Sequence, residues 1–220
     1  MTRARHFQQR GDAGRELGKA LRAVQTEPDP IVIGLPRGGV MVAAEVAEVL
    51  GAPLDVLAVR KLGVPGHEEL AMGAIASDGS RHLNDEIAWR VRPSDLAVVT
   101  AREEAELQRR DALYRKGAPR LALSGRTAVL VDDGLATGAT MAVAVTAVHA
   151  ADAARIVVAA PVAAPDTAAW MRKLVDEVVV LIEPRDFAAV GWYYDDFRAT
   201  TDDEVIAALA ASRESRSRHD

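Results

Sequence analysis

Short runs of Val, Ile and Leu recur along the chain between longer segments in which apolar residues return with helical spacing. The runs are short and are bounded by turn residues, which is typical of strands buried on both faces of a parallel sheet. They predict five strands, at residues 31–35, 54–59, 128–131, 156–159 and 178–182.

The segments between these strands have the length and spacing of helices, at residues 40–50, 94–115, 137–150 and 166–175. Ser94 is the expected cap of the longest one. A further helix is expected to follow residues 11–14 and to reach about Val24, and a polar, arginine-rich tail that frays is expected from Ser212. Strand and helix alternation of this kind predicts an α/β fold, an open parallel five-stranded sheet with helices on both faces.

Ligands of open α/β sheets bind where loops leave the carboxyl ends of the strands. The loops expected at residues 36–39, 60–80 and 132–140 are therefore the places to look for chemistry. Four of the chain's nine aromatic residues lie together after the last strand, at Trp192, Tyr193, Tyr194 and Phe197.

The composition narrows the class of protein without naming a reaction. The 220 residues predict one domain over residues 1–211, followed by the tail at 212–220. The chain has no cysteine, which excludes disulfides, thiolate nucleophiles and cysteine-ligated metals. Its formal net charge of −5 makes nucleic acid an unexpected partner.

The first seven residues are basic and lack the apolar run of a signal peptide. No stretch approaches eighteen uninterrupted apolar residues, the length that predicts a membrane span. We therefore expect a cytoplasmic protein with no membrane partner.

The densest motif is a buried strand that runs into Asp132 and Asp133 and then into a loop of small residues opening a helix. Backbone N–H groups and hydroxyls at such a helix start suit a phosphate. Two carboxylates would repel that phosphate, so they suit hydroxyl donors or a bridging divalent cation. A sugar phosphate has both a phosphate for the helix start and hydroxyl donors for the carboxylates. The Lys of a Walker loop is absent, since Ala139 follows Gly138. The competing interpretation is an acidic helix start capped by Asp133.

The string from residue 129 to residue 140 resembles the phosphoribosyl pyrophosphate (PRPP) motif of the type I phosphoribosyltransferase (PRTase) family. Residues 34–40 resemble the pyrophosphate loop of that family, and residues 59–65 resemble the start of its flexible catalytic loop. The resemblance is greatest to a bacterial branch of phosphoribosyltransferase-domain proteins. It implies a core at about residues 28–183 and a hood from about residues 1–27 and 184–211.

The resemblance also implies roles for individual residues. Asp132 and Asp133 would bind the ribose hydroxyls and contact Mg²⁺, the implied cofactor, indirectly. The 5′-phosphate would lie on Ala136, Thr137, Gly138, Ala139 and Thr140. The pyrophosphate would lie on Arg37, Gly38 and Gly39, after a cis peptide between Pro36 and Arg37, with Arg60 and Lys61 closing over it. Asp132, Asp133, Arg60 and Lys61 are thus the catalytic candidates.

The acceptor is expected to lie under the aromatic segment, where the family builds its hood. Phe187, Trp192, Tyr193 and Asp195 are the candidate acceptor residues, with Trp192 or Tyr193 stacking on a planar ring. The competing interpretation is that Trp192 and Tyr194 only seal the core.

The implied activity is Mg²⁺-dependent transfer of phosphoribosyl from PRPP to a nitrogen acceptor, a small molecule, with release of pyrophosphate by a homodimer. Ala136 stands where the 6-oxopurine branch has an Asp base, and Gly134 replaces a branched residue and is expected to add backbone freedom. The first alternative is a regulatory protein that senses PRPP or a nucleotide without turnover, and the second is a hydrolase of phosphoribosyl compounds.

Two groups of cations have simpler interpretations. Arg60 and Lys61, at a strand end, can be merely solvated. In the charged helix, the Glu and Arg residues at 103–110 are explained as helical pairs, or Arg109, Arg110 and Arg115 reach a phosphate on a neighbouring subunit.

Overall fold

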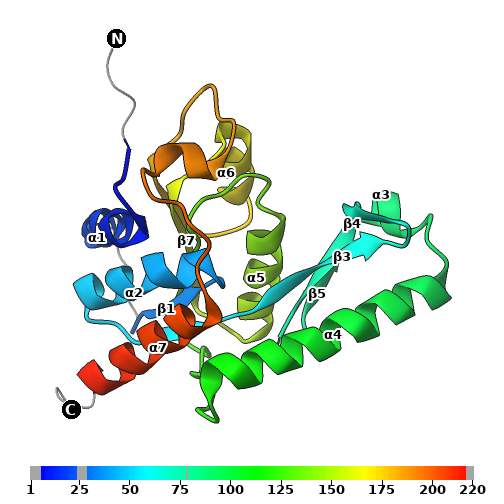
Figure 1. The fold of residues 1–220 in the computed structure, drawn as a ribbon, viewed down its shortest axis with the longest axis horizontal. Helices are drawn as coiled ribbons and strands as arrows, with labels where there is room; N and C mark the ends of the chain where they lie inside the picture. Colours follow the sequence, from blue (N-terminus) through cyan, green and yellow to red (C-terminus); the bar gives the residue numbers. More distant parts are fainter. Residues whose placement is uncertain (1–5, 24–28, 78, 217–220) are drawn as a thin grey trace.

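The computed structural model describes residues 6–23, 29–77 and 79–216 (Figure 1). Its strands are β1 (Ile31–Gly34), β2 (Leu54–Val56), β3 (Val59–Val64), β4 (His67–Ala76), β5 (Arg81–Leu83), β6 (Thr127–Val131), β7 (Arg155–Val162) and β8 (Glu177–Ile182). Its helices are α1 (Arg10–Leu21), α2 (Gly38–Leu50), α3 (Asp85–Ala88), α4 (Pro93–Arg115), α5 (Ala139–Ala150), α6 (Pro165–Met171) and α7 (Asp202–Arg216), with a 3₁₀ turn η1 (Val190–Tyr193).

The main sheet has the order β2-β1-β6-β7-β8, and all its pairs are parallel. The five strands and the α/β fold class predicted from the sequence are thus confirmed. Alternate residues of β6 face opposite sides: Leu130 packs with α5 and α6, whereas Val129 and Val131 pack with α1, α2 and α7. Both faces are therefore buried, which explains the nearly continuous apolar runs.

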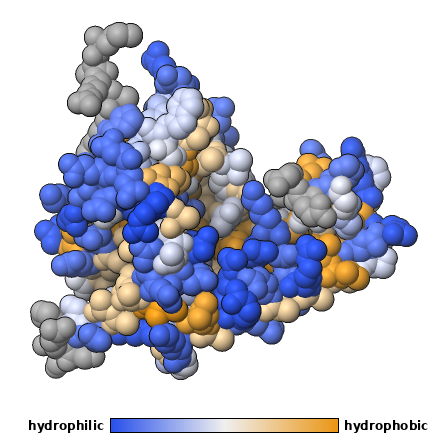
Figure 2. Space-filling view, viewed as in Figure 1, coloured by the Kyte–Doolittle hydropathy of each residue, from blue (hydrophilic) through white to orange (hydrophobic). Residues whose placement is uncertain are grey.

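An arm projects from this core and consists of the antiparallel sheet β3-β4-β5 with α3 and α4 (Figure 1). Its own small core packs Leu62, Met72 and Ile75 of the strands against Val99 and Leu107 of α4. The prediction of a loop at residues 60–80 is therefore wrong. Figure 2 shows an open hollow between the arm and the rest of the molecule.

Several element ends differ from the sequence predictions. Helix α4 begins at Pro93 after Arg92, so Ser94 is not its cap, because proline at the first position already fits a helix start. Helix α6 ends at Met171, and α7 continues through residues 212–216, where a frayed tail was expected. Val24 and the tail residues 217–220 lie outside the described residues. No helix of the described ranges is long and apolar enough to cross a bilayer.

Helix α1 lies close against α2, and its glycines permit this approach. Residues 11–14 were expected to precede the helix, yet they form its first turn. A Cβ built on Gly14 would lie 2.6 Å from the carbonyl oxygen of Val42, and one on Gly18 would lie 2.8 Å from Cβ of Val49. Because the two helices touch through backbone, the start of α1 has a fixed position over the sheet.

We expect Gly14→Ala to destabilise the protein by about 1–2 kcal/mol, since overpacking of about 1–3 kcal/mol exceeds the helix-propensity gain of up to about 1 kcal/mol. Gly11→Ala is the matched control, because its Cβ would meet nothing closer than 3.4 Å. Urea unfolding of both variants measures the difference. Equal stability of the two variants would contradict the close helix contact.

Candidate active site

The strand order changes direction between β1 and β6. The chain passes from β1 to β2 on one side, and β6 returns on the other side of β1. The loops that follow β1 and β6 therefore leave the same edge of the sheet next to each other. Such a switch point is where open α/β sheets bind ligands.

Two glycines bring these loops into contact. A Cβ on Gly38 would lie 1.9 Å from Oδ2 of Asp133, and one on Gly39 would lie 2.9 Å from Oδ1 of Asp132. Any other residue at either position would displace a carboxylate. The peptide between Pro36 and Arg37 is cis, as predicted.

The two carboxylates are partly buried and interact with each other. Oδ1 of Asp132 accepts a hydrogen bond of 2.8 Å from the backbone N–H of Asp133. Burial raises the pKa of Asp132 well above its ordinary value, and the adjacent charge of Asp133 raises it further. Burial also raises the pKa of Asp133, although Arg10 acts in the opposite direction. Both groups are thus easier to protonate than an exposed aspartate.

Arg10, the first residue of α1, is a site residue that sequence reasoning missed. Its Nε donates a 2.7 Å hydrogen bond to Oδ2 of Asp133, and its Nη1 donates to the carbonyl of Arg198 at 2.8 Å. Its guanidinium lies 4.0 Å from the ring centre of Phe197. No local pattern marks it, because its partner is 123 residues away.

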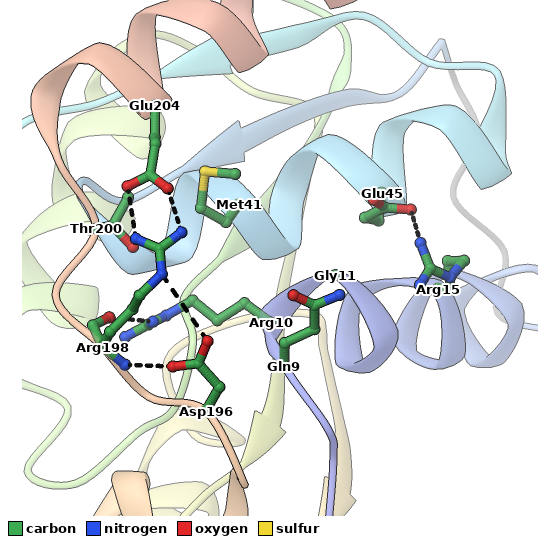
Figure 3. Close-up of a pocket in the computed structure, with 10 residues that line it drawn as sticks. All are labelled: Gln9, Arg10, Gly11, Arg15, Met41, Glu45, Asp196, Arg198, Thr200 and Glu204. Carbon is green, nitrogen blue, oxygen red and sulfur yellow. Dashed lines mark hydrogen bonds and ion pairs between the residues drawn. The ribbon is translucent and has the colours of Figure 1, made fainter.

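Arg10 also lines a cavity of about 190 Å³ between α1, α2 and the segment that leads into α7 (Figure 3). The other charged groups of that cavity are paired with one another: Arg15 with Glu45, and Arg198 with both Glu204 and Asp196. Arg10 therefore separates this ion-paired cavity from the carboxylates.

The small-residue loop has the shape expected of an anion site. Gly138 caps α5 with a left-handed backbone, φ 72°, while Ala136 and Thr137 are exposed. Within the described residues, no carbonyl or side chain accepts a hydrogen bond from the backbone N–H of 136, 137 or 138. The carbonyl of Ala136 is held by Thr167 Oγ1 at 2.6 Å. The loop is thus anchored with its donors unused.

The aromatic segment covers the carboxylates from the other side. The hydroxyl of Tyr194 donates to the carbonyl of Asp133 at 2.6 Å, and a Cβ on Gly134 would lie 2.4 Å from Val190 Cγ1. Gly134 is therefore required by close packing, which corrects the expectation that it supplies backbone freedom. The N-terminal segment pairs with this one: Phe7 N–H donates to Tyr193 O, and Asp195 N–H donates to Phe7 O, each at 2.9 Å.

The candidate acceptor residues divide into buried and exposed groups. Tyr193 is buried and stacks on Phe187 with ring centres 6.0 Å apart. Trp192 is 68% exposed, and Asp195 is exposed too. Of the four, Trp192 and Asp195 expose their side chains to a ligand, whereas Tyr193 is buried and Phe187 is half-buried against it. Tyr194 is buried, as the core-sealing interpretation requires, but Trp192 is not.

The two candidate cations of β3 have different surroundings. Nε of Arg60 donates to Oε2 of Glu103 on α4 at 2.7 Å. Lys61 is exposed, and no described residue pairs with it. Both lie on a strand of the arm that faces the start of α5.

Comparison with known proteins agrees with this geometry. Residues 8–196 match the model of the phosphoribosyl transferase domain family. The chain is 50% identical over 206 residues to two Mycobacterium tuberculosis proteins, from strains CDC 1551 and H37Rv, that carry the provisional name phosphoribosyl transferase. That match covers 92% of this chain and 46% of each relative, so the chain spans about half the length of these relatives.

The crystal structure of TT1426 from Thermus thermophilus is similar over nearly the whole chain, with a TM-score of 0.83 and 45% identity. The match covers 94% of this chain and 98% of that one. The family match extends over most of the chain and includes both loops at the switch point. This chain therefore belongs to the phosphoribosyl transferase domain family.

Proposed function

We propose that this chain transfers the 5-phosphoribosyl group of PRPP to a nitrogen atom of a small planar acceptor and releases pyrophosphate. The C1′–O bond breaks with its electron pair leaving on pyrophosphate, and a nitrogen lone pair forms the C1′–N bond. The acceptor nitrogen loses its proton as this bond forms. Family membership supports the reaction class, and the residue roles below are the proposal.

The observation that carries the proposal is the close approach of the Gly38–Gly39 loop to the carboxylates of Asp132 and Asp133, next to a loop whose backbone N–H groups at 136–138 are unused. Asp132 and Asp133 offer acceptors for the vicinal ribose hydroxyls. Ala136, Thr137, Gly138, Ala139 and Thr140 offer N–H groups and hydroxyls for the 5′-phosphate. Gly38 and Gly39 lie against the carboxylates from the neighbouring loop, where the pyrophosphate would lie beside Arg37.

The carboxylates fit Mg²⁺ only as part of a larger ligand set. No group of three or more His, Asp or Glu residues that could hold a metal exists among the described residues. Magnesium is usually bound by one or two carboxylates together with substrate phosphates and water. Asp132 and Asp133 would thus hold the ion indirectly, and its charge would stabilise the departing pyrophosphate.

The protein's own contribution is positioning and charge stabilisation. Arg37, Arg60 and Lys61 would meet the negative charge that develops on pyrophosphate. Trp192 would stack on the acceptor, and the exposed Asp195 would accept its ring N–H and take the proton as the C1′–N bond forms. The alternative is a PRPP-sensing regulatory protein, for which the exposed Ala136 leaves the position of one possible base empty.

A screen of free bases and small amines with PRPP and Mg²⁺, following pyrophosphate release, separates the two. Turnover with one acceptor establishes the transferase. Tight PRPP binding without release across the panel supports the sensor instead.

Asp133→Ala is expected to weaken PRPP binding about ten- to a hundredfold, because a hydrogen bond to a charged group contributes roughly 1.5–3 kcal/mol. The double variant with Asp132→Ala should lose more. Titration calorimetry with Mg²⁺ measures both, and Asp203→Ala, an exposed carboxylate on α7, is the control. Unchanged PRPP affinity in the double variant would contradict the assignment of these two carboxylates to the ribose hydroxyls.

The burial of Asp132 gives a prediction for the stability of the ligand-free protein. Because the folded pKa of Asp132 is raised, stability falls as the pH rises from the unfolded pKa of about 3.9 through the folded pKa. Asp132→Asn removes this loss and retains the acceptor for Asp133 N–H. At pH 8 we expect the melting temperature of the variant to lie roughly 2–4 °C above that of wild type, which for a chain of this size corresponds to about 1 kcal/mol of unfolding free energy. At pH 4 we expect a smaller rise in melting temperature. Calorimetric melting at both pH values checks it; a variant less stable at pH 8 than wild type refutes it.

Trp192→Leu should raise the acceptor KM several-fold and leave PRPP affinity near wild type, because an aromatic stack contributes on the order of 1 kcal/mol beyond buried area. Tyr193→Leu, which removes a buried ring, should mainly lower the melting temperature. Steady-state kinetics with the acceptor that the screen identifies measures the effect of Trp192→Leu on KM. If Trp192→Leu leaves the acceptor KM unchanged, the stacking role is wrong.

A further inference from the structure

Helix α4 carries a charged residue in the middle of its buried stripe. Val99, Leu107 and Tyr114 mark the face that packs against the rest of the molecule, and Glu103 lies on the same face. The side chain of Glu103 is only 7% exposed. A carboxylate is seldom buried to this extent unless cations hold it.

Glu103 is held by two arginines from different elements. Its Oε2 accepts from Arg60 Nε of β3 at 2.7 Å, and its Oε1 accepts from Arg102 Nε at 3.0 Å. One carboxylate thus fixes two guanidinium groups at the junction between the arm and the core.

These groups line a polar cavity of about 360 Å³ that also includes Lys61 and Arg110. Arg110 pairs with Glu106 at 2.7 Å, but Glu106 is not part of the lining. Arg60, Lys61, Arg102 and Arg110 carry four positive charges. Glu103 and Glu106 together carry two negative charges, so the net charge of the group is +2 even with Glu106 included. The described residues therefore leave positive charge in this cavity uncompensated.

The cavity opens beside the proposed substrate loops. Thr140, the last residue of the proposed 5′-phosphate loop, forms part of its wall. Burial and the hydrogen bond to Asp202 raise the pKa of Tyr114 to about 12, while the nearby charges of Arg110 and Arg37 act against that rise. The charges of Arg110 and Arg37 therefore both reach the hydroxyl of Tyr114.

We propose that this cavity binds an anion of the pyrophosphate class and that Arg102 and Arg110 of α4 are binding residues for it, together with Arg60 and Lys61. The inference rests on the proposed function and adds α4 to the site. A guanidinium presents a rigid fork of donors to phosphate oxygens, and Glu103 orients two of the forks before the anion arrives. Helix α4 thus brings Arg102 and Arg110 to the site within one chain. Of these two, Arg110 belongs to the group that the sequence pattern explained as helical pairs.

The test is calorimetric binding of inorganic pyrophosphate with Mg²⁺ to wild type, Arg102→Gln, Arg110→Gln and the double variant. We expect the double variant to bind at least tenfold more weakly. Arg109→Gln is the matched control, because Arg109 also pairs with Glu106 but does not line the cavity; it should stay within twofold of wild type. Arg110→Lys should retain part of the pyrophosphate affinity that Arg110→Gln loses, because lysine keeps the positive charge.

Wild-type affinity in a double variant with a wild-type melting temperature overturns the inference, as does the absence of pyrophosphate binding to wild type at millimolar concentration. PRPP titrations keep the two proposals apart. PRPP binding that needs Asp133 but ignores Arg102 and Arg110 leaves the proposed function standing without this pocket. If the chain binds pyrophosphate through Arg110 but binds no PRPP, the anion pocket stands and the proposed function fails.

Discussion

The contact between the glycine loop after β1 and the carboxylates after β6 is the constraint on which the rest of the site depends. Gly38 and Gly39 leave no room for a side chain against Asp133 and Asp132. The two loops meet only because β1 and β6 are parallel neighbours in the sheet. Helix α1, held on α2 through glycines, then delivers Arg10 to the same point.

The charges of the site form two opposed groups. The partly buried pair, Asp132 and Asp133, has raised pKa values because of burial, and the charge of Arg10 compensates it in part. In the cavity whose wall includes Thr140, the cations of β3 and α4 (Arg60, Lys61, Arg102 and Arg110) outnumber the carboxylates. A ligand with hydroxyl donors at one end and phosphates at the other would satisfy both groups. Buried charge that costs stability in the free protein is typical of sites arranged for a ligand.

The strands and the Asp-Asp motif were predictable from sequence because their signals are local. Runs such as Ile31–Gly34 are apolar since both faces of the sheet are covered, and the motif is contiguous. Arg10 and Glu103 were not predictable, because each acts through a residue more than forty positions away. The arm was not predictable either, since its strands are paired only with each other and packed on α4. The close approach at Gly134 depends on Val190, which no local pattern indicates.

The most direct test of the account is a crystal structure of the protein with PRPP and Mg²⁺. The account requires the ribose hydroxyls within hydrogen-bond distance of Asp132 and Asp133, and the 5′-phosphate on the loop that ends at Thr140. It also requires the pyrophosphate between the Gly38 loop and the cations of β3 and α4. A PRPP molecule bound elsewhere, with the Arg10–Asp133 pair and both loops unchanged and empty, would contradict it.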